Sequence, residues 1–232
     1  MLPEVAGYET RLLLTRLRAY CLPGDDEAAR FVRAMKMTQK GEFRLSPTGR
    51  WLPFTAEEVI ETTISSFRWQ ARFGRGIHSF TVTDTFEQGH GRLVVKAGGL
   101  VPVRKASGPE VDEGELQRYL AEIPTCPPIL LNHAGLQWES IGPLTLRVRD
   151  RQHSATAVDL DIDENGQPLV ARAQRPRMVG KLAVSTPWSG LCHDYQEREG
   201  MRLPHRLEAQ WHLAEEVFTY IRVELTSVAI IR

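Results

Sequence analysis

One seven-residue segment shows most clearly what this chain can fold into. Residues 67–73 read FRWQARF, so large apolar side chains alternate with arginine and glutamine. Successive side chains of a β-strand point to opposite faces of the sheet, so this alternation predicts a strand with one buried face and one polar face. Residues 158–163 and 206–213 alternate in the same way. A chain built from such strands has to cover one face of its sheet.

The strands follow one another closely along the chain. Further strands are predicted at residues 77–86, 92–96, 100–104 and 217–231. Asn165-Gly166 is a typical dipeptide of a tight hairpin turn. Because few helical crossovers separate the strands, the sequence predicts an antiparallel sheet.

Three helices are expected among these strands. Residues 8–20 place leucines at helical spacing between arginines, and residues 55–64 begin with Thr55 and Glu58 at the spacing of a capping box. Residues 112–123 carry an apolar stripe at i, i+3, i+4 and i+7, which predicts an amphipathic helix.

These patterns together predict an α+β fold that is mainly β. We expect a strongly curved antiparallel sheet, an open half-barrel, with two or three helices on its concave side. A helical segment is expected at residues 1–30, and a single sheet domain with inserted helices at residues 31–232.

The charge balance argues against a nucleic-acid partner. Lys+Arg and Asp+Glu are equal at 29 each, so the chain has no general cationic field. One basic run holds Arg172, Arg175, Arg177 and Lys181, but no aromatic residues lie between them for base stacking. This run is expected to be a solvated sheet edge.

The cysteines and the N-terminus point to a compartment. Three cysteines without a CxxC pair favour neither a disulfide framework nor a zinc site. The first twenty residues carry Glu4 and Glu9, and Arg16 and Arg18 interrupt their apolar run, so neither a signal peptide nor a membrane span is predicted. The expected location is the cytoplasm.

Cys192-His193-Asp194 is the segment that most resembles catalytic chemistry. In a strand His193 would face away from both neighbours, and catalytic triads are assembled from residues far apart in sequence. A lone cysteine more often behaves as a small buried hydrophobe. No catalytic residue is predicted here.

No metal or cofactor is predicted either. Asp161, Asp163, Asn165 and Gly166 match the first half of a calcium loop, but Arg172 stands where the loop needs its glutamate. An acidic hairpin is the expected structure. The seven histidines form no HxH or HExxH pair.

The helix at residues 112–123 carries the candidate ligand site. Arg118 is spaced to pair with Glu115 and Glu122 on the same helix. If this helix face is solvated, which is the commoner case, these are ordinary surface ion pairs. If the helix lies in the mouth of a curved sheet, Arg118 is a buried charge that needs a carboxylate or an anionic ligand head. The candidate ligand-binding residues are Trp69, Arg118, Tyr119, Glu122 and Trp138.

Five segments in this order carry a family resemblance: QKGEF (39–43), SFRWQARF (66–73), DTFEQGHGRL (84–93), LQRYLAEI (116–123) and YQEREGMRLP (195–204). Together they resemble a bacterial family of uncharacterised proteins, a domain of unknown function, from about residue 31 onward. Members of that family often carry a membrane-anchoring N-terminal segment, whereas this chain starts with an amphipathic helix. More distantly the chain is similar to the LolA and LolB type of lipoprotein carrier, in which a half-barrel plugged by helices holds an acyl chain.

Three functional hypotheses follow. The leading one is a non-catalytic binding protein for an apolar or amphipathic, lipid-like small molecule, held between the sheet and the helix at residues 112–123. The alternatives are a hydrolase-like enzyme with a dispersed site that uses Asp84 or Glu122 as a base, and a scaffold that binds a protein partner.

Overall fold

Thirteen strands pair in one antiparallel sheet in the computed structural model, which describes residues 7–24, 26–76, 79–180 and 182–232. The first half of the chain supplies β1 (Ala34–Phe43), β2 (Leu52–Glu61), β3 (Phe67–Phe73), β4 (Phe80–Glu87), β5 (His90–Ala97) and β6 (Val101–Ser107). The second half supplies β7 (Leu136–Gly142), β8 (Thr145–Asp150), β9 (Ala157–Ile162), β10 (Pro168–Val179), β11 (Leu182–Arg198), β12 (Met201–His212) and β13 (Val217–Ile231).

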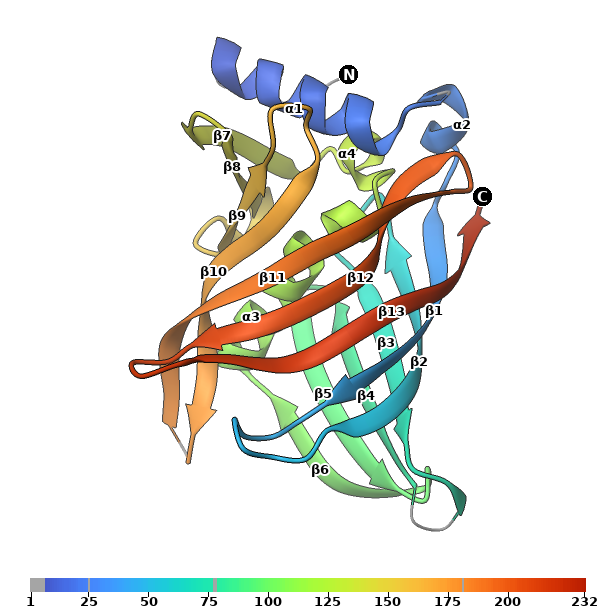
Figure 1. Ribbon diagram of the computed structural model, residues 1–232, viewed down its shortest axis with the longest axis vertical. Helices are drawn as coiled ribbons and strands as arrows, with labels where there is room; N and C mark the ends of the chain where they lie inside the picture. Colours follow the sequence, from blue (N-terminus) through green and yellow to red (C-terminus); the bar gives the residue numbers. More distant parts are fainter. Residues whose placement is uncertain (1–6, 25, 77–78, 181) are drawn as a thin grey trace.

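The first and last strands join the two halves of the sheet. The strand order is β6-β5-β4-β3-β2-β1-β13-β12-β11-β10-β9-β8-β7. Apart from β1 and β13, all strands that lie side by side in the sheet are consecutive in the sequence. β1 pairs with β13 from Ala34↔Ile231 to Phe43↔Ile221. The edge strands β6 and β7 do not pair with each other, so the sheet is curved but open (Figure 1). The predicted mainly-β antiparallel fold is confirmed.

The helices cover the inside and one end of this sheet. They are α1 (Tyr8–Cys21), α2 (Asp26–Arg30), α3 (Pro109–Ala121) and α4 (Ile129–Asn132), with single 3₁₀ turns at Ile123–Thr125 and Arg151–His153. Figure 1 shows α1 across the top of the sheet and α3 on its concave side. α1 packs against β7, β8 and β12, and α3 packs against β4, β5 and β10. Among the described residues, no helix has the length and apolarity to cross a membrane.

The helix predicted at residues 55–64 is wrong. These residues belong to β2 and the loop after it, and β2 pairs with β1 on one side and β3 on the other. Phe54, Ala56, Glu58 and Ile60 alternate as the buried face. The capping-box spacing is therefore a coincidence, and pairing on both edges decides the local structure. The helices predicted at residues 8–20 and 112–123 are confirmed as α1 and α3.

Candidate functional site

Arg118 of α3 points at the concave face of the sheet and contacts three carboxylates. Its Nη2 donates to Glu58 Oε1 at 2.9 Å, its Nη1 to Asp84 Oδ2 at 3.1 Å, and its Nε to Glu122 Oε1 at 2.8 Å. Only 18% of the Arg118 side chain and 2% of the Glu58 side chain are exposed. The expectation of ordinary solvated helix pairs is therefore wrong, because α3 lies inside the curved sheet.

Strand register brings the sheet residues of this cluster together. Glu58 of β2 lies opposite Trp69 of β3, and Trp69 lies opposite Asp84 of β4. The guanidinium of Arg118 sits 4.8 Å from the centroid of the Trp69 ring, a cation–π distance. Gln39 of β1 completes the row, since it donates to Glu58 Oε2 at 2.6 Å and accepts from Trp69 Nε1 at 2.8 Å.

A second guanidinium borders the cluster from β10. Arg175 donates through Nη2 to the backbone oxygen of Gly114, at 2.7 Å, and lies 4.7 Å from the Trp188 ring centroid. Glu115, the next residue of α3, is buried. It lies close enough to Arg118 and Arg175 for both positive charges to act on its pKa. α3 is thus held between cationic and anionic groups from both halves of the sheet.

The cluster holds more carboxylates than guanidinium groups. Glu58, Asp84, Glu115 and Glu122 face Arg118 and Arg175, and one oxygen each of Asp84, Glu115 and Glu122 is buried without a hydrogen-bond partner. Burial raises the pKa of Asp84 to about 6 and that of Glu115 to about 8. Burial, together with the charge of Glu122, also raises the pKa of Glu58. The raised pKa values favour protonation of these carboxyl groups, which lowers the negative charge of the cluster.

Three of the five residues predicted to bind ligand meet in this cluster, namely Trp69, Arg118 and Glu122. Tyr119, the neighbour of Arg118, is fully buried and donates from its hydroxyl to the backbone oxygen of Glu61 at 3.0 Å. Trp138 is buried on the edge strand β7, far from β3 in the strand order. Whether any of the five binds a ligand stays a prediction.

Glu58, Gln39 and Arg175 belong to the cluster but were not predicted as site residues from the sequence. A signal was present in the strand pattern, because Glu58 and Asp84 occupy positions that alternation assigns to the apolar face. Asp84 stands between Val82 and Phe86, two residues away on either side, and an isolated carboxylate there needs a cationic partner. Arg118 is the partner that α3 supplies.

A second buried polar cluster ties the β2–β3 loop to the rest of the core. Ser65 Oγ donates to Asp150 Oδ2 and lies 3.2 Å from Nε2 of His133. Nδ1 of His133 accepts from the backbone N–H of Gly135 at 3.2 Å, and burial lowers the pKa of this histidine. In a catalytic triad the carboxylate binds Nδ1–H and the serine faces Nε2. Here the serine and the aspartate both lie on the Nε2 side of the ring, which is not the arrangement of a catalytic triad. The hydrogen bonds hold the β2–β3 loop against the core.

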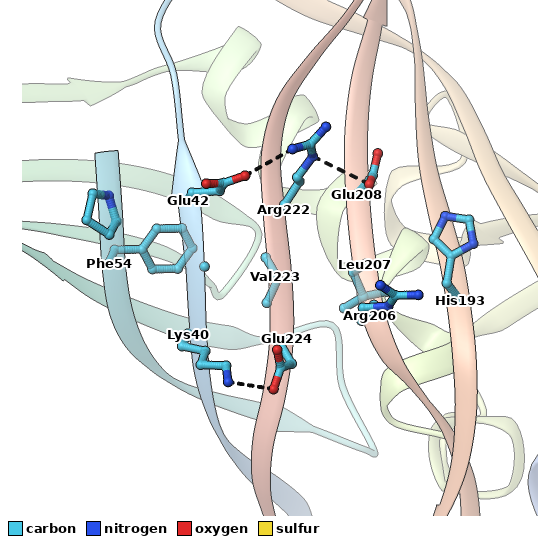
Figure 2. Close-up of a pocket in the computed structure, with 12 residues that line it drawn as sticks. Lys40, Glu42, Phe54, His193, Arg206, Leu207, Glu208, Arg222, Val223 and Glu224 are labelled. Carbon is cyan, nitrogen blue, oxygen red and sulfur yellow. Dashed lines mark hydrogen bonds and ion pairs between the residues drawn. The ribbon is translucent and has the colours of Figure 1, made fainter. Parts of the chain in front are cut away.

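A groove of about 780 Å³ opens across β1, β2, β11, β12 and β13 (Figure 2). Its charged side chains lie on the outer face of the sheet, since Lys40 and Glu42 alternate with the buried Gln39. They pair across the strands, Lys40 with Glu224 at 2.8 Å and Arg222 with Glu42 at 3.0 Å. This groove is therefore not the predicted space between sheet and α3.

The Cys192-His193-Asp194 segment forms no catalytic group. Cys192 is buried, and burial raises the pKa of its thiol to about 12. His193 is exposed and borders the outer groove, while Asp194 pairs with Arg206. The prediction that strand alternation separates Cys192 from His193 is confirmed.

The acidic hairpin and the basic run pair with each other, and the expectation that the run is a sheet edge is wrong, because β10 lies between β9 and β11. Asp161 of β9 accepts from Arg172 of β10, and the carboxylate of Asp163 accepts the backbone N–H groups of Asn165 and Gln167 in the turn. In the part of the chain that the structure describes, no group of three or more His, Cys, Asp or Glu is placed to hold a metal ion. Lys181 lies outside the described residues.

A family model matches residues 15–229, and its description is a family of unknown function, DUF6920. The chain belongs to this family. The resemblance to an uncharacterised family that the motifs predicted is thereby confirmed. None of the curated proteins matches this DUF6920 chain.

Solved structures with the same fold extend the comparison. A LolA superfamily protein of Nitrosomonas europaea has 11% identity and a TM-score of 0.52, with 97% of this chain and 95% of that chain covered. A DUF1329 family protein of Desulfovibrio piger has 8% identity and a TM-score of 0.53, with 97% and 94% covered. At these identities the likeness concerns the fold alone, and it bears out the open, curved antiparallel sheet expected for this DUF6920 chain.

Proposed function

We propose that this protein binds an apolar or amphipathic small molecule on the concave face of its sheet, beneath α3, without transforming it. The observation that carries the proposal is the way α3 covers that face. Most of the concave side chains are apolar, and α3 contacts them through its own buried Leu116 and Leu120 as well as through the charge cluster around Arg118. The fold shared with a LolA superfamily protein supports the same reading.

A helix that contacts a sheet partly through buried charges costs less to separate from it than one that packs through apolar side chains alone. Taking ion pairs out of water costs much of what their attraction returns, so a buried network contributes little net stability. On separation, Arg118 and its carboxylates regain water, and the apolar side chains beneath become accessible to a ligand. α3 is therefore the element proposed to move, with the ligand taking its place on the sheet.

Because of the raised pKa values, the separation of α3 from the sheet should depend on pH. Asp84 and Glu115 hold protons more tightly when α3 covers them than they would in water. Separation of α3 therefore releases protons, and it is favoured as the pH rises through the window of about 4 to 8. Ligand uptake should be stronger at the alkaline end of this window.

The proposal is tested by native mass spectrometry of freshly purified protein, followed by organic extraction of whatever leaves it. A reproducible apolar molecule of fixed mass, or uptake of one from a mixed lipid extract, is the expected result. A clean apo mass with no uptake at either end of the pH window would count against the proposal.

A second candidate function is a hydrolase-like enzyme, and the same cluster supplies the observation that favours it. Buried carboxylates with raised pKa values and unpartnered oxygens are typical of catalytic acids and bases. Turnover of ester or amide substrates that is lost in Asp84→Asn, with ligand uptake unchanged, would select the enzyme over the binding protein.

A further inference from the structure

The outer face of strands β3 to β6 carries a row of cations. Strand register places Arg68 of β3 and Arg92 of β5 on either side of Thr85 of β4. In the same way Arg72 and Lys96 lie on either side of Thr81. These positions face outward, because on β3 they alternate with buried Phe67, Trp69, Ala71 and Phe73. Lys105 of β6 continues the same face beside Val94. We call Arg68, Arg72, Arg92, Lys96 and Lys105 the basic face.

The basic face lacks the acidic partners that other cations of the outer surface have. Across the described ranges, none of its five side chains forms an ion pair with a carboxylate. Elsewhere on the sheet Lys36 pairs with Glu57, Lys40 with Glu224 and Arg147 with Asp159. A chain with no net charge therefore concentrates uncompensated positive charge on one end of its sheet.

An exposed apolar hairpin borders the basic face. Leu100, Val101 and Val103 are 84%, 63% and 62% exposed at the β5–β6 turn and on the edge strand that follows. They lie beside Lys96, which pairs with Pro102 in the ladder. Figure 1 shows β6 at the lower edge of the sheet, at the opposite end of the molecule from α1.

We propose that the basic face and this hairpin dock on the surface of an anionic lipid bilayer. Clustered lysine and arginine side chains are attracted to anionic headgroups, and exposed aliphatic side chains beside them insert at the interface. This surface is distinct from the concave site and does not depend on the proposed function.

The chemistry favours a bilayer over a nucleic acid. Proteins that hold single strands place aromatic rings among their cations, so that bases can stack. The outward residues of β3 to β6 are mainly arginine, lysine, threonine and valine, with Glu87 and His90 at one end, and they include no phenylalanine, tyrosine or tryptophan. An aliphatic hairpin end has no use against a phosphate backbone, whereas it fits the interfacial region of a membrane.

The test is flotation of the full chain with vesicles of phosphatidylcholine alone and of phosphatidylcholine mixed with phosphatidylglycerol. Binding is expected only to the mixed vesicles and should weaken as ionic strength rises. The triple variant Arg72→Gln/Lys96→Gln/Lys105→Gln should bind about a hundredfold more weakly, about fivefold for each cation removed. Leu100→Ser/Val101→Ser should weaken binding about tenfold.

The matched control removes the same charge from paired positions, as Lys36→Gln/Lys40→Gln/Arg222→Gln. It should bind the mixed vesicles like the unmodified chain, and thermal unfolding followed by circular dichroism shows whether each variant is folded. Equal losses in both triple variants, equal binding to both vesicle types, or no binding at all would overturn the proposal. Binding to a DNA oligonucleotide without binding to vesicles would overturn it in favour of a nucleic-acid partner.

Discussion

Nη2 of Arg118 lies 2.9 Å from Oε1 of Glu58, although 60 residues separate them in the sequence. This contact joins α3 to β2, and through Asp84 it joins α3 to β4 as well. The last turn of α3, the main cover of the concave face, is therefore joined to the sheet by charge, in addition to the apolar packing of Leu116 and Leu120.

Replacing Arg118 by methionine should destabilise the protein strongly. The change leaves Glu58, Asp84 and Glu122 buried without their cation, and the expected loss is about 3–5 kcal/mol in the free energy of unfolding. Urea denaturation measures it. Arg147→Met breaks the more exposed pair with Asp159 and serves as the control, with an expected loss of no more than about 1 kcal/mol. Similar small losses in both variants would contradict a central role for the buried cluster.

Glu115 should make stability fall as the pH rises. The folded protein holds the Glu115 proton up to about pH 8, whereas the unfolded chain releases it near its ordinary pKa. The stability that this proton contributes is therefore complete below about pH 4 and is lost as the pH rises through about 8.

Comparison of the unmodified chain with Glu115→Gln isolates this contribution. The difference in the free energy of unfolding between the two should change steadily from pH 4 to pH 8, in the direction that favours the unmodified chain at low pH. Glu113→Gln, at an exposed position of the same helix, should show a constant difference. A constant difference for Glu115→Gln would mean that this carboxyl has an ordinary pKa.

A side chain at position 41 should disturb the junction of the two sheet halves. A Cβ on Gly41 would lie 2.2 Å from the backbone oxygen of Arg222 and 2.7 Å from Cζ of Phe54. Gly41→Ala should therefore lose about 1–3 kcal/mol of stability, as overpacked sites do. At Gly142 the nearest atom would be 3.5 Å away, so Gly142→Ala is the control and should change stability little. An equally small change in the free energy of unfolding for both variants would show that the pairing of β1 and β13 accommodates a side chain at position 41.

The three cysteine thiols should be inert in the folded protein. Cys21, Cys126 and Cys192 are buried, and burial raises the pKa of each thiol. Reaction with a chromogenic disulfide reagent should be at least about a hundredfold slower than that of glutathione, because only the exposed thiolate reacts. In urea, which unfolds the protein, all three thiols should react with the reagent. Rapid labelling of any one of them in native buffer would place that residue at a surface.

The sequence was most informative where a single strand or helix decides the outcome. FRWQARF predicted β3 and its buried face correctly, and the apolar stripe of residues 112–123 predicted α3. β2 was misread, because its capping-box spacing is local and its pairing with β1 and β3 is not. Strand parity could have corrected this, since Phe54, Ala56 and Ile60 alternate along it.

The candidate site was less predictable, because its contacts depend on the curvature of the sheet. Arg118 and Glu122 could be paired from helical spacing alone. Whether α3 faced water or the sheet decided the roles of Glu58 and Asp84, and neither spacing nor composition contains that information. An arginine and carboxylates at core-facing positions were the available clue, and they become decisive only once the concave side is known.

The proposed binding of a ligand on the concave face beneath α3 can be mapped residue by residue. A fatty acid with a photoreactive diazirine in its chain tests it most directly, by irradiation of the mixture near pH 8 and residue-level mapping of the adducts. We expect adducts on inward side chains such as Trp69, Val82 and Leu116, and fewer of them at pH 5. Adducts confined to outward neighbours such as Arg68 and Thr83, or no adducts at either pH, would contradict it.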